Sequence, residues 1–101
     1  MTEKVWYRSS EGSTIQDRGT LTVGEGRIEF AGKKGKVSGR IRSAKKRPMG
    51  FKNWIHVSYE AADTGEAHDA YFLVSGMLGW GGVLGGNGKL TEALQAEAPR
   101  P

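Results

Sequence analysis

Basic side chains crowd one part of this chain, where their type and spacing suit the binding of an anion. Between Phe30 and Tyr59 there is no acidic residue, and the nine basic ones are Lys33, Lys34, Lys36, Arg40, Arg42, Lys45, Lys46, Arg47 and Lys52. The net charge of the whole chain is only +4, because acidic residues outnumber basic ones outside this segment. A single cationic segment on an otherwise acidic protein is the strongest functional lead in the sequence.

Apolar residues interrupt the end of this segment, since Met49 and Phe51 lie between Arg47 and Lys52. Each basic residue near an anionic membrane surface contributes about 1 kcal/mol of binding, and Met49 and Phe51 are candidates to insert into the interface. The same features suit single-stranded nucleic acid, through phosphate neutralisation and base stacking. The acidic remainder would repel a long polyanion, so nucleic acid ranks below lipid. A solvated cationic face or a protein-binding surface is the alternative.

A glycine-rich stretch, "LGWGGVLGGNGKL" at 78–90, invites comparison with a phosphate-binding loop. The Walker motif requires Gly-x-x-x-x-Gly-Lys-Ser/Thr, because backbone amides surround the phosphates and the final hydroxyl holds Mg²⁺. Aligning the Gly-Lys pair at 88–89 places Val83 at the first glycine and Leu90 at the hydroxyl position. Both ends of the motif fail. We predict a connector that its apolar residues anchor in the core, namely Trp80, Val83 and Leu84.

The two histidines, His56 and His68, are expected on neighbouring strands of one hairpin. A turn centred near Thr64 would place His68 beside Glu60 and His56 beside Phe72, far apart along the ladder. A shared metal would need both rings and further ligands within a few ångströms. The chain has no cysteine, and no nucleophile elbow is present. We therefore predict no catalytic residue, no metal site and no cofactor.

Alternating apolar residues predict the short antiparallel strands that must carry the basic side chains. "TLTV" (20–23) and "RIEF" (27–30) share one apolar face and are joined by a tight turn at 24–26. Further strands are expected over 4–9, 37–41, 53–60 and 70–74, with a bulge at Gly39. The lysines of 33–36 would then occupy a turn. The basic residues at 45–47 would enter a loop, because "RPMGF" (47–51) breaks the alternation.

Helical periodicity is confined to "GNGKLTEALQAEA" (86–98), where Asn87 is a candidate N-cap and Leu90, Ala93 and Leu94 share a face. Six or seven short strands followed by one helix predict a mainly β fold. The expected architecture is a small antiparallel barrel or a partly open sandwich, with the helix covering an opening.

The run "GTLTVGEGRIEFAGKKGKVSGRI" (19–41), followed by "NWIHVSYE" (53–60) and "AYFLV" (70–74), resembles the pleckstrin-homology-like superfamily. It is most similar to the GRAM and bacterial members. The resemblance covers residues 4–97 and implies a barrel of about seven strands capped by a C-terminal helix. The length of the chain predicts a single domain, here 4–97, and its last residues, 98–101, are expected to form a frayed tail. The resemblance also implies binding of lipids, phosphoinositide head groups or protein segments without catalysis. Phosphoinositide-binding members carry a basic cluster on the first hairpin, whereas this chain has only Arg8 and Arg18 there.

These observations predict a non-enzymatic binding or adaptor domain that recognises anionic head groups or a membrane surface through the basic segment. The alternative is a protein–protein interaction module that binds a peptide or a partner strand, and a small nucleic-acid-binding barrel ranks last. The chain starts without a secretory signal and has no cysteine. We expect a cytoplasmic protein, peripheral at the membrane if the basic segment binds lipid.

Overall fold

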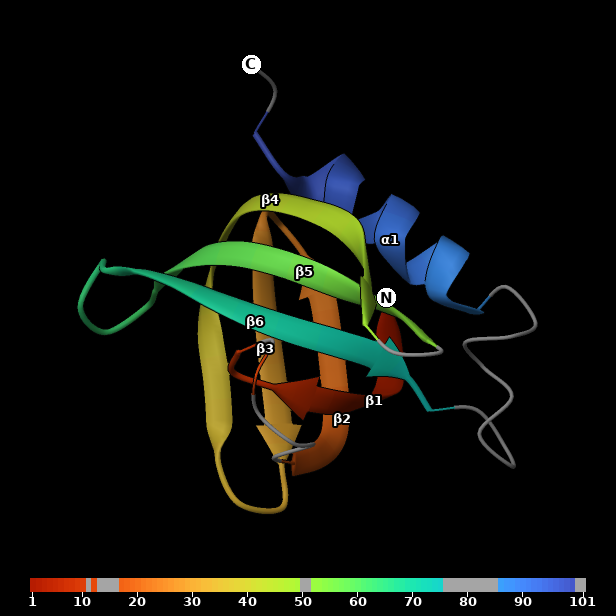
Figure 1. Ribbon diagram of the computed structural model, residues 1–101. Helices are drawn as coiled ribbons and strands as arrows, with labels where there is room; N and C mark the ends of the chain where they lie inside the picture. Colours follow the sequence, from red (N-terminus) through yellow and green to blue (C-terminus); the bar gives the residue numbers. More distant parts are fainter. Residues whose placement is uncertain (11, 13–16, 50–51, 76–85, 100–101) are drawn as a thin grey trace.

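A computed structural model describes residues 1–10, 12, 17–49, 52–75 and 86–99, which form a ring of strands and one helix (Figure 1). The elements are β1 (Thr2–Arg8), β2 (Asp17–Gly24), β3 (Arg27–Gly32), β4 (Lys36–Met49), β5 (Lys52–Ala61), β6 (Ala67–Val74) and α1 (Gly86–Glu97). Each strand is antiparallel to the next, and β1 also pairs with β6, so the sheet closes on itself. The predicted mainly β barrel with a C-terminal helix is confirmed. The described residues contain six strands, within the six or seven that the alternation predicts and one fewer than the seven or so that the resemblance implies.

The hairpin of β2 and β3 forms as the alternation predicts. Leu21 lies opposite Phe30 and Val23 opposite Ile28, and all four side chains are buried. Glu25 and Gly26 have φ of 55° and 75°, the left-handed pair that a two-residue turn needs to match the twist of its strands. The Gly26 amide donates to Glu97 Oε2 at 2.7 Å, which ties the turn to the end of α1.

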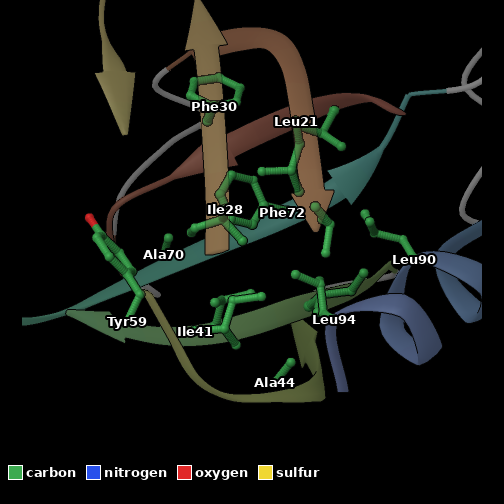
Figure 2. Close-up of a cluster of buried hydrophobic side chains, with 14 of the residues drawn as sticks. Leu21, Ile28, Phe30, Ile41, Ala44, Tyr59, Ala70, Phe72, Leu90 and Leu94 are labelled. Carbon is green, nitrogen blue, oxygen red and sulfur yellow. The ribbon is translucent and has the colours of Figure 1, made fainter. Parts of the chain in front are cut away.

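The core fills the barrel and continues onto the helix (Figure 2). The rings of Tyr7, Phe30 and Phe72 meet at centroid distances of 5.1 to 5.8 Å and join three strands across the interior. Leu90 and Leu94 enter the cluster from α1 and are fully buried. The predicted apolar face of the helix therefore covers one end of the barrel.

Strand β4 differs most from the prediction. The residues at 45–47 do not enter a loop, because β4 continues to Met49 and pairs with β5 along this stretch. The strand leaves β3 after Arg40, and a register shift between Ile41 and Ser43 lets it bend over the barrel end. In Figure 1 it rises from the β3–β4 turn and arches beneath α1.

The bulge predicted at Gly39 is wrong, because Gly39 keeps regular register with Ile28 and Ala61. Glycine is required at this position for another reason, since a Cβ there would collide with the carbonyl oxygen of Glu60. The helix begins at Gly86, and the side chain of the predicted cap, Asn87, lies outside the described residues. The residues predicted to anchor the connector in the core, Trp80, Val83 and Leu84, also lie outside them. No helix in the described ranges is long and apolar enough to cross a membrane.

Candidate anion-binding surface

The basic segment divides into two groups that the bend of β4 separates. The turn lysines (Lys33, Lys34 and Lys36) lie where β3 passes into β4, and the β4 basic group (Lys45, Lys46 and Arg47) lies beyond the bend; all six are exposed. Between them, Arg42 forms an ion pair with Glu60 at 3.4 Å, and Arg40 lies directly opposite Glu60 in the ladder. The two groups therefore act as different surfaces.

The expected membrane-interface residues lie at the end of β4. Met49 is the last residue of the strand and pairs with Lys52 at the start of β5. The side chains of Met49 and Lys52, and the whole of Phe51, lie outside the described residues. Their predicted role stays a prediction.

Beside the β4 basic group lies an apolar cluster on the outside of the barrel. This outer aromatic cluster consists of Trp54, Tyr71 and Leu73, with the partly buried Trp6 packed against them. The ladder places Arg47 opposite Trp54 and Lys45 opposite His56, so both cations border the cluster along β5. Trp54 is only 3% exposed, and it is buried in this outer cluster and not in the barrel core.

Two arginines reach the same cluster from β1 and β2. The guanidinium carbon of Arg8 lies 5.2 Å from the centroid of the Trp54 ring, and that of Arg18 lies 4.8 Å from the Trp6 ring. Such cation–π contacts contribute about 0.5–1 kcal/mol at exposed sites. The outer aromatic cluster therefore has cations on both flanks. Sequence reasoning missed this arrangement, and its only signal was the alternation of Trp6 with Arg8 in the first strand.

His56 extends this surface toward an acidic residue. Its ring stacks on Tyr71 at a centroid distance of 4.7 Å, and its Nε2 lies 2.8 Å from Asp69 Oδ1. The predicted register is wrong by one residue, because the turn is centred half a residue before Thr64: His56 faces Tyr71, and His68 faces Tyr59. The described part of the chain contains no group of three side chains able to hold a metal ion.

One carboxylate organises the turn lysines. Asp17 Oδ1 accepts hydrogen bonds from the amides of Arg18 and Lys33, and Oδ2 accepts from those of Lys34 and Gly35. Burial alone would raise the pKa of Asp17, but the four backbone donors outweigh it and hold the pKa below its usual value. Gly32 is needed here, because a Cβ would occupy the position of Asp17 Oδ2.

The same carboxylate affects the barrel interior. Burial raises the pKa of the Tyr7 hydroxyl, and the negative charge of Asp17 raises it further. Tyr7 therefore stays neutral at physiological pH and serves the core as an aromatic ring.

No protein-family model matches the chain, and neither a curated protein nor a solved structure shows significant similarity to it. The resemblance to the pleckstrin-homology-like superfamily thus stays a prediction, and the functional argument depends on the geometry of the site.

Proposed function

We propose that this protein is a non-enzymatic binding module that recognises an anionic partner, membrane lipid head groups in the first place, through the outer face of its barrel. One observation carries the proposal: the outer aromatic cluster is bordered by the β4 basic group on one flank and by Arg8 and Arg18 on the other. The predicted likeness to pleckstrin-homology-like and GRAM domains supports the same function.

The position of the charges favours a surface over a deep site. Lys45 and Arg47 are exposed on the face of β4 that lies beside His56 and Trp54, so they can approach a charged plane together, and Lys46 is exposed on the other face of the same strand, within a Debye length of that plane. At about 1 kcal/mol per basic residue, these three would contribute about 3 kcal/mol to binding an anionic membrane, or roughly a hundredfold in affinity. Asp69 lies on β6, separated from the β4 basic group by β5, and its Oδ1 is 2.8 Å from His56 Nε2.

The test is co-sedimentation with neutral and with phosphatidylserine-containing vesicles at low and high salt. We expect binding to the anionic vesicles alone, weakened by salt, and weakened roughly a hundredfold in the variant Lys45→Ala/Lys46→Ala/Arg47→Ala. The variant Lys34→Ala/Lys36→Ala/Lys89→Ala removes the same charge from exposed positions elsewhere and is expected to lose much less. Equal loss in both variants, or no binding to anionic vesicles, would overturn the proposal.

A second candidate, a module that binds a partner strand, is favoured by the edge of β4. Strand β3 pairs with β4 only as far as Arg40, and beyond that point the described pairing of β4 is with β5 alone. An extended peptide could add to the free side near α1, where Gln95 Nε2 already donates to the Ala44 carbonyl oxygen at 3.0 Å. Lysines on such an edge also oppose aggregation. Peptide binding that persists at high salt and in the β4 triple variant would favour this candidate.

A further inference from the structure

A groove on the outer face of β1, β2 and β3 collects a different set of cations. It has a volume of about 420 Å³, and its lining includes Lys4, Arg18, Thr20 and Lys33. None of the described residues that line it is acidic. The β4 basic group takes no part in this groove.

The groove exists because small residues meet at its floor. Thr20 pairs with Lys4 on one side and with Ala31 on the other, so only short side chains lie between the longer ones. Gly32 continues this floor along β3. Glycine is required at the neighbouring Gly19, where a Cβ would collide with the Ala31 carbonyl oxygen. The groove is therefore lined by small residues where β2 packs closely on β3, and the cations Lys4, Arg18 and Lys33 line its sides.

The backbone beneath two of these cations is fixed. Asp17 Oδ1 accepts from the amide of Arg18 at 2.7 Å and from that of Lys33 at 3.0 Å, and the Lys33 amide also lies 3.3 Å from the Arg18 carbonyl oxygen. The Trp6 ring supports the guanidinium of Arg18. On the third side, the Lys4 carbonyl oxygen accepts from the Ser75 amide at 2.8 Å, beside the closure of the barrel. The backbone that carries these three cations is thus ordered before a ligand binds.

We propose that this groove binds a phosphate group, carried by a small molecule or by a lipid head group. A phosphomonoester has a charge near −2 at neutral pH and three acceptor oxygens. The Arg18 guanidinium can donate to two of these oxygens at once, while Lys4 and Lys33 supply point charges and the Thr20 hydroxyl one more donor. A carboxylate has one charge and two oxygens and would leave part of this set unused. The site shares Arg18 with the proposed membrane-binding surface but uses none of the β4 basic group, so Lys33, which lines only the groove, distinguishes the two.

Besides Asp17, whose carboxylate accepts from the backbone amides of Arg18 and Lys33, a second acidic residue on β3 is expected to weaken the site. Glu29 lies on the outward-facing position of β3 just before Ala31 and lines a separate groove with Glu25 and Arg27. Its charge opposes an anion at the Lys4–Arg18–Lys33 groove. The variant Glu29→Gln is therefore expected to bind phosphate more tightly than the natural chain does.

The experiment is a titration of the isotope-labelled protein with inorganic phosphate at constant ionic strength, followed by amide chemical shifts. We expect saturable shifts centred on Thr20 and Lys33, and about tenfold weaker binding in either Arg18→Gln or Lys33→Gln. The matched variant Lys45→Gln is expected to bind as the natural chain does. Because Lys33→Gln alters no contact of the core, its spectrum also checks that weaker binding does not come from unfolding.

Two further ligands distinguish the sources of the phosphate. Glycerol 3-phosphate presents a soluble monoester, and phosphatidic acid vesicles present the same group at a membrane. Lys33-dependent binding of the soluble ligand alone would identify a small-molecule site, and Lys33-dependent vesicle binding would identify a head-group site. Shifts that do not saturate, or that Lys45→Gln weakens as much as Arg18→Gln does, would show anion condensation on the β4 surface and overturn the proposal.

Discussion

Asp17 determines the conformation of the β3–β4 turn, because four backbone amides donate to its two carboxylate oxygens. An asparagine has the same shape but replaces one acceptor oxygen by a donor group, so Asp17→Asn would leave two amides facing an NH₂ group. We expect this variant to fold with a clearly lower melting temperature. Asp69→Asn, which changes an exposed carboxylate whose partner among the described residues is His56, is the matched control. Equal melting temperatures for the Asp17 variant and the natural chain would contradict this role.

The same residue predicts a dependence of stability on pH. The pKa of Asp17 is lower in the folded state than in the unfolded chain, where it is about 3.9. Its contribution to the free energy of unfolding is therefore complete above the unfolded pKa and is lost as the pH falls through the folded pKa. Thermal melts from pH 7 to pH 2 should show a steeper fall below pH 4, by about one protonated group, for the natural chain than for Asp17→Asn. Parallel curves would mean that Asp17 titrates alike in both states.

For single residues, the sequence identifies the charged side chains but not the residues that lie beside them in space. All nine predicted cations are visible as a run, yet Arg40 and Arg42 lie beside Glu60, which follows them by many residues. Arg8 and Arg18 meet the outer aromatic cluster only because β1 pairs with both β2 and β6. Alternation says which residues share a face of a strand, and it does not say which strands are adjacent.

Among the elements, the β2–β3 hairpin could be predicted and the length of β4 could not. The turn at 24–26 carries its own signal, because Gly26 adopts a left-handed conformation. Pro48 and the lysines before it suggest a loop, since proline cannot donate to a ladder. In the structure Pro48 pairs with Asn53 near the end of β4, on a strand whose described partner there is β5 alone. A strand with one free side tolerates a proline that a central strand would not.

The helix is the element whose removal should most weaken the barrel end. Leu94 is fully buried against the strands, so Leu94→Ala should lower the free energy of unfolding by about 2–5 kcal/mol. Glu92→Ala changes an exposed position of the same helix and should cost less than about 0.5 kcal/mol. Urea denaturation measures both. A small effect of Leu94→Ala would mean that α1 contributes little to holding the end of the barrel closed.

For the molecule as a whole, closure of the ring couples the stability of the first strand to that of the last, because β1 pairs with β6. Val5 pairs with Val74, and the rings of Tyr7, Phe30 and Phe72 connect β1, β3 and β6 through the interior. No strand can leave this ring without exposing the aromatic rings that the others bury. We therefore expect the described barrel to unfold in one cooperative transition.

Phe72→Ala tests this coupling, because the fully buried ring contacts the other two. The substitution should lower the free energy of unfolding by about 3–5 kcal/mol, a large share of the roughly 5–15 kcal/mol typical of a single domain. Tryptophan fluorescence, which includes Trp6 and Trp54 on the outer face, and far-UV circular dichroism should report the same shifted midpoint. A fluorescence transition that moves without the dichroism transition would show that the outer aromatic cluster unfolds separately from the ring. Coincident transitions would mean that the surface proposed to meet the anionic partner is held in place by the whole barrel.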